Sequence, residues 1–130
     1  MTGLDTNVVV RILTRDDPAQ VRRAVELFAS GPLWLPKTVL LETEWVLRSA
    51  YSLSPETILE SFRSLLGYPP LVVEDHADVL RALRWYEQGL DFADALHLAS
   101  LGPAERFATF DARLGDEASR IADTPPVDRL

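Results

Sequence analysis

Prolines and glycines interrupt this chain at short intervals, and the pieces between them alternate between two kinds of pattern. Short apolar or β-branched runs are typical of buried strands, and they occupy residues 2–4, 33–35, 71–73 and 106–110 and a last segment near Val127. Longer stretches predict helices over residues 7–14, from 18, over 38–50, from 54, over 78–88 and 91–101, and after 111. Strands that alternate with helices predict a parallel sheet with helices on both faces. We therefore predict one α/β domain over residues 1–130, built on a central parallel sheet of four or five strands.

Composition and motifs exclude several classes of protein. The sequence has no cysteine, which rules out a disulfide scaffold and thiolate metal ligands. The formal net charge of −7 argues against a protein that coats nucleic acid through bulk electrostatics, although a nuclease needs only local cations. Phosphate-binding loops, dinucleotide turns and nucleophile elbows are absent. No apolar stretch approaches the roughly 20 residues that span a bilayer, and no signal peptide is recognisable, so we expect a cytoplasmic protein without a membrane partner.

Two aspartates follow predicted strands. Asp5 comes directly after the first strand, and Asp111 ends the run FATFD. In open α/β sheets, ligands bind beyond the carboxyl ends of the strands, so both side chains are expected at that edge. An aspartate between a strand and a helix is usually a helix cap, so each one alone also has an ordinary structural explanation.

Three further acids lie in predicted helices. Asp91 and Asp94 are three residues apart at a helix start, a spacing that puts both on one face and that also fits a capping box. Glu42 lies in the middle of a helix among apolar residues, where capping cannot explain it. It either points to solvent or has a partner, because an unpaired buried carboxylate is costly. Glu44 is the competing candidate, and position alone does not decide between the two.

Convergence of these acids would create a metal site. Mutual repulsion would raise their pKa values unless a cation lay among them, and an oxygen-only donor set favours Mg²⁺ or Mn²⁺. The residues alone leave two other functions open. One is an aspartate-based phosphatase or phosphoacceptor domain with Asp5 as nucleophile, although Asp5 is followed by Thr-Asn rather than by a second acid. The other is a non-catalytic α/β binding module whose acids only cap helices.

Four segments carry a resemblance to a known family. LDTNVVVRIL, VLLETEWVLR, DFADALHLA and ATFDARL resemble, in this order, the four acidic segments of PIN-domain proteins. Together they span almost the whole chain, and its small size is similar to that of the VapC toxins within the family. The resemblance implies a PIN-like fold and a VapC-like ribonuclease that hydrolyses RNA phosphodiester bonds with Mg²⁺ or Mn²⁺. It also implies a homodimer and inhibition by a cognate VapB-like antitoxin.

The resemblance assigns roles position by position. Asp5, Glu42, Asp94 and Asp111 match the catalytic metal-binding acids, and Asp91 matches a less regular acidic position beside them. The polar residues Asn7 and Thr109 match positions that support the site. Glu44 falls where the family has an apolar residue, so the resemblance favours Glu42.

Arginines and one apolar segment are candidates for contacts with partners. Arginine suits bidentate contacts to phosphate or to carboxylates, so we expect RNA or antitoxin contacts at Arg11, Arg15 and Arg48, with Arg113 as a further candidate. Each is equally well explained as a solvated helix residue. The segment Trp45-Val46-Leu47 shares a helix with Glu42, so we expect an apolar surface near the site that receives the antitoxin.

Overall fold

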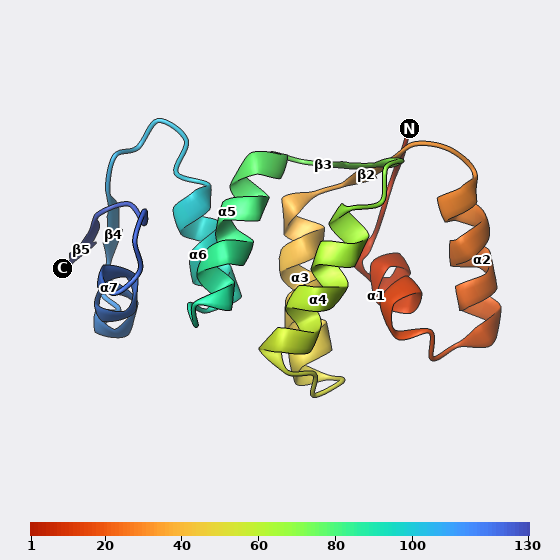
Figure 1. The fold of residues 1–130 in the computed structure, drawn as a ribbon, viewed down its shortest axis with the longest axis horizontal. Helices are drawn as coiled ribbons and strands as arrows, with labels where there is room; N and C mark the ends of the chain where they lie inside the picture. The colour runs from red at the N-terminus through yellow and green to blue at the C-terminus, as the bar shows by residue number, and fades with distance from the viewer. The chain divides into compact units, whose positions relative to one another are not determined.

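A computed structural model describes all residues from 1 to 130 and divides into two compact units, residues 1–76 and 77–130. It contains seven helices and five short strands, and every strand pair is parallel. The predicted α/β class is therefore confirmed (Figure 1). The strands do not form one sheet, since three of them pair in the first unit and two in the second. The single-domain assignment stays a prediction.

The first unit is a three-stranded sheet with four helices. Its sheet has the order β1 (Thr2–Gly3), β2 (Leu33–Leu35) and β3 (Leu71–Val73), so each strand pairs with the next one along the chain. Strand β2 is the central strand. It pairs with β1 on one side, where Trp34 lies opposite Gly3, and with β3 on the other. The helices are α1 (Thr6–Thr14), α2 (Pro18–Ala29), α3 (Lys37–Ser49) and α4 (Pro55–Leu66), and α1 packs against both α2 and α3.

Local sequence explains where these elements begin. Asp17 and Ser54 cap α2 and α4, and each is followed by a proline that cannot donate a backbone hydrogen bond and therefore suits a first helical turn. The predicted strands at residues 33–35 and 71–73 match β2 and β3. The first and third residues of each of these strands are buried, which explains why both runs are apolar.

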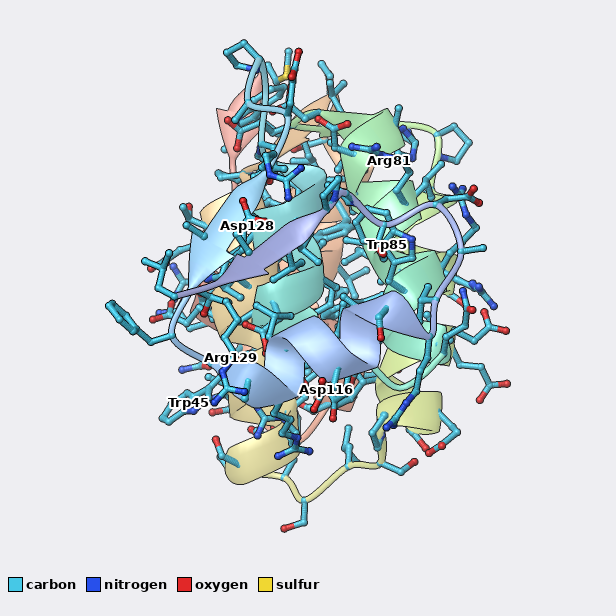
Figure 2. The ribbon with its side chains drawn as sticks, turned by 90° about the vertical axis from the view of Figure 1, so that its left-hand side faces the viewer. Trp45, Arg81, Trp85, Asp116, Asp128 and Arg129 are labelled. Atoms are coloured by element: carbon cyan, nitrogen blue, oxygen red, sulfur yellow. The ribbon has the colours of Figure 1, made fainter.

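The second unit contains three helices and the remaining two strands. Helices α5 (His76–Glu87) and α6 (Phe92–Ala99) precede β4 (Phe107–Thr109), α7 (Ala112–Ser119) and β5 (Val127–Arg129). Strands β4 and β5 pair in parallel, and α7 packs against both. Trp85 is almost completely buried, and the Arg81 guanidinium lies 5.5 Å from the centre of its ring (Figure 2). No helix in the chain is long and apolar enough to cross a membrane.

Candidate active site

Asp5 and Glu42 line one cleft in the first unit. Asp5 follows β1 and caps α1, where its carboxylate accepts a hydrogen bond of 2.8 Å from the backbone N–H of Thr6. The Thr6 hydroxyl donates to the Glu42 carboxylate on α3. One threonine therefore bridges the two acids. The cleft has a volume of about 440 Å³, and its lining also includes Asn7, Val10, Arg11, Val46, Ala50 and Tyr51.

The two glutamates of α3 have different surroundings. Glu44 is 2% exposed, and the guanidinium Nε of Arg48 donates to it at 3.0 Å, one helical turn away. Glu42 is exposed and lies at the cleft. Burial and the ion pair with Arg48 give Glu44 a structural role, and the exposure of Glu42 at the cleft supports Glu42 as the candidate ligand.

Arg11 is held at the same cleft by a polar network. Its Nε donates to the Gln20 side chain at 2.6 Å, and its Nη1 donates to Asp16 and to the Tyr51 hydroxyl at 3.2 and 3.0 Å. Tyr51 in turn donates to Asp16 at 2.7 Å. This hydrogen bond, together with one from the Thr14 hydroxyl, holds the pKa of Asp16 below its usual value. The network fixes the position of the Arg11 guanidinium and offsets its charge.

Three candidate acids lie in the second unit. Asp91 caps α6 and accepts a hydrogen bond from the backbone N–H of Asp94 at 3.1 Å, which is half of the predicted capping box. Asp111 caps α7 and accepts from the backbone N–H of Arg113 at 2.9 Å. The Thr109 hydroxyl accepts a hydrogen bond of 3.0 Å from the backbone N–H of Asp111.

Asp94 is the carboxylate whose charge this unit disfavours. Its partial burial raises its pKa above the usual value, and the negative charges of Asp91, Asp111 and Glu117 raise it further, whereas His97 acts in the opposite direction. Raised pKa values are the expected result of acids that share a site without a cation. The electrostatics therefore place Asp94 in the same local field as Asp91 and Asp111.

The four principal acids thus form two groups, Asp5 with Glu42 and Asp94 with Asp111. Their convergence on a single cleft stays a prediction, as does the metal site. Within neither unit do three acids or histidines come together as a preformed metal cluster. The candidate ligands are nonetheless all carboxylates, and the pKa of Asp94 is raised first by its partial burial and then by like charges that a cation would relieve. Carboxylate oxygens are the ligands that Mg²⁺ and Mn²⁺ prefer.

The candidate arginines are mostly engaged within the protein. Arg48 pairs with Glu44, and Arg113 donates to Glu117 at 2.8 Å. Arg15 ends α1 in a left-handed conformation and forms no ion pair. Among the four arginines considered from the sequence, Arg15 therefore has the side chain most available to a ligand.

The apolar segment of α3 does not form one exposed surface. Trp45 is 59% exposed and projects outward (Figure 2), and Val46 lines the cleft. Leu47 is completely buried, so its expected contribution to a partner surface is wrong. Helical geometry is the reason, because neighbouring residues on a helix point in directions about 100° apart.

Sequence reasoning missed three residues that shape these sites. Thr6 was part of the quoted motif, but its bond to Glu42 joins residues 36 positions apart. Tyr51 lies two residues after the end of α3 and has no local pattern that indicates its role. Glu117 lies four residues after Arg113, a spacing typical of a helical ion pair, so this pair was readable from the sequence.

The chain matches a family model described as PIN domain over residues 4–122. No curated protein and no solved structure gives a significant match to the chain.

Proposed function

The chain belongs to the PIN-domain family, whose members are generally nuclease-like, and on that premise we propose that it is a metal-dependent endoribonuclease of the VapC toxin type. The observation that carries the proposal is the position of the family acids. Asp5 and Glu42 meet at one cleft, and Asp94 lies in the electrostatic field of Asp91 and Asp111. All five match the acidic segments of the resemblance.

The proposed site contains Asp5, Glu42, Asp94 and Asp111, with Asp91 beside them, and these carboxylates would hold Mg²⁺ or Mn²⁺. Such an ion supplies Lewis-acid stabilisation of the charge that develops on a phosphodiester during hydrolysis. The protein's own residues prepare this arrangement. The Thr6 hydroxyl orients Glu42, and backbone N–H groups at the starts of α1 and α7 orient Asp5 and Asp111. In the metal-free protein the pKa of Asp94 is raised, first by its partial burial and then by the charges of neighbouring acids, and a bound cation would lower that pKa.

The partner and the assembly belong to the same proposal. A VapB-like antitoxin binds near the cleft, and the homodimer follows from the resemblance. The cytoplasmic location is supported by a sequence without cysteines. Support for the antitoxin comes from Trp45, an exposed aromatic residue on the helix that also carries Glu42. A basic side chain from the antitoxin, above all an arginine, suits this acidic target and would compete with metal.

Cleavage of RNA by the purified, antitoxin-free protein tests the activity. We expect cleavage with Mg²⁺ or Mn²⁺ and none with EDTA, while an aspartyl-phosphate trapped at Asp5 would support the phosphatase alternative instead.

Co-expression with the product of an adjacent small open reading frame tests the toxin assignment. A tight complex with suppressed activity is expected, and a complex that cleaves RNA as fast as the free protein would contradict it.

A further inference from the structure

Helices α1 and α2 pack against each other (Figure 1), and residues of both line a second cleft. It has a volume of about 510 Å³, within the range of ligand sites. From α1 it is lined by Asn7, Val8 and Arg11, and from α2 by Gln20, Arg23, Ala24 and Leu27. The lining contains two arginines and two amides and no acidic residue, although the chain as a whole has a net charge of −7.

The two clefts meet at α1. Asn7 and Arg11 line both of them, so the α1–α2 cleft adjoins the cleft that holds Asp5 and Glu42. The first cleft therefore contains the carboxylates, and the α1–α2 cleft adds Gln20 and Arg23 to the two residues that both clefts share. An RNA backbone that crosses the carboxylates extends naturally into a cleft of this polarity, because its next phosphate needs positive charge and hydrogen-bond donors.

Arg23 supplies the uncompensated charge of this cleft. Arg11 is offset by Asp16 in the network described above. Arg23 is exposed and forms no hydrogen bond or ion pair, and the side chain of Asn7 is equally without a partner. The bond from Arg11 to Gln20 ties α1 to α2 across the cleft and positions these two side chains in advance.

We propose that the α1–α2 cleft is the subsite for an RNA backbone phosphate next to the scissile one, with Arg23 as its principal cation and Asn7 as a hydrogen-bond donor. This inference rests on the proposed ribonuclease function. A protein partner with acidic side chains would need the same positive charge, but continuity with the carboxylate cleft favours the substrate of that cleft.

Arg22 offers a matched control. It lies on the same helix, is exposed and forms no ion pair, but it does not line the cleft. Arg22→Ala and Arg23→Ala therefore change the net charge equally, and neither removes a buried group. Binding of a labelled single-stranded RNA to the full chain is measured in EDTA, where the proposed cleavage is off, over a range of salt concentrations.

Arg23→Ala is expected to weaken RNA binding about tenfold and to reduce the slope of log affinity against log salt by about 0.7, the value for one phosphate contact on a single strand. Arg22→Ala is expected to change binding less than about twofold, since exposed charges are screened beyond about 8 Å at physiological salt. Arg23→Lys keeps the charge and is expected to recover most of the affinity.

Equal losses in the Arg22→Ala and Arg23→Ala variants, or no RNA binding by the wild type, would overturn the subsite. Equal losses would instead favour the alternative occupant of this cleft, a protein partner with acidic side chains. Cleavage by the wild type in Mg²⁺ is measured in parallel. Cleavage with equal losses overturns the subsite alone, whereas binding that depends on Arg23 without any cleavage overturns the proposed ribonuclease and leaves Arg23 as part of an RNA-binding site only.

Discussion

Asp5 and Glu42 in the first unit both accept hydrogen bonds from one residue, Thr6, through its backbone N–H and its hydroxyl. The acids of the second unit have no such bridge. Asp94 lies partly buried in the field of Asp91 and Asp111, and its pKa rises for that reason. The comparison shows two ways of placing carboxylates near one another. In one, a neutral donor stabilises them without a cation, and in the other the unfavourable charge is left for a ligand to offset.

The largest expected effect is the loss of RNA cleavage when a candidate acid of either unit is replaced while the fold is retained. Asp5→Asn and Asp94→Asn are each expected to lower RNA cleavage at least about 100-fold, because each removes a charged ligand from the proposed site. Asp5→Asn keeps the cap on α1, so the fold is expected to remain intact. Cleavage rates and circular dichroism check both points. Wild-type activity and metal dependence in Asp5→Asn would show that Asp5 is only a cap.

The second prediction compares the two glutamates of α3. Glu44→Ala is expected to lower the free energy of unfolding by about 1–3 kcal/mol, since it removes a buried partner of Arg48. Glu42→Ala is expected to cost less than about 1 kcal/mol but to abolish cleavage. Urea unfolding and RNase assays on both variants measure the difference. If Glu44→Ala also abolished cleavage in protein shown to be folded, the choice of Glu42 as the ligand would be wrong.

The third prediction tests the threonine bridge. Thr6→Val keeps the shape of this buried side chain but removes the donor to Glu42, so we expect about a tenfold loss of cleavage and about 1 kcal/mol of stability. Thr6→Ser retains the hydroxyl and is expected to keep most of the activity. Equal activity in Thr6→Val and Thr6→Ser would show that the bridge does not position Glu42.

The smallest effect concerns pH in the metal-free protein. The raised pKa of Asp94 means that the folded state binds this proton more tightly than the unfolded state. Its contribution to stability is present below the ordinary pKa of 3.8 and is lost as the pH rises through the raised value. Asp94→Asn is therefore expected to be more stable than the wild type at neutral pH, by less than about 1 kcal/mol.

Thermal unfolding in EDTA at several pH values measures this difference. The advantage of Asp94→Asn should shrink as the pH falls toward 3.8. Asp16 is the control for the direction of the effect, because its pKa is shifted in the opposite direction from that of Asp94. Its pKa is lowered by hydrogen bonds from Tyr51 and Thr14, so its contribution is present above the ordinary value and is lost only as the pH falls through the lowered one. A constant advantage of Asp94→Asn across this range would contradict the role of charge.

Local patterns in the sequence predicted the elements well because their causes are local. Prolines at the first turns of α2 and α4 and fully apolar runs at β2 and β3 fix those segments without reference to the rest of the chain. The caps Asp5, Asp91 and Asp111 were also readable. Each of the three caps a helix in the structure, and their roles as metal ligands belong to the proposed function.

Contacts between distant residues could not be predicted in the same way. The bonds from Thr6 to Glu42 and from Tyr51 to Asp16 join residues 36 and 35 positions apart, and no spacing rule reaches that far. The engagement of Arg11 follows from the same network. The strands pair into two separate sheets, and this pairing depends on how the chain crosses from one strand to the next. Local sequence patterns therefore could not show that the single predicted sheet was wrong.

The order of the strands in the first unit has a consequence for synthesis on the ribosome. All pairings of β1, β2 and β3 lie within residues 2–73, so this sheet has its strands before the second unit is made. Asp111 is translated 38 residues after Val73, which takes roughly 2–8 s at typical elongation rates. Under the proposed function, a nascent chain that has completed its first unit therefore still lacks Asp94 and Asp111 for seconds. The proposed nuclease would then spare the message that encodes it until translation is nearly complete.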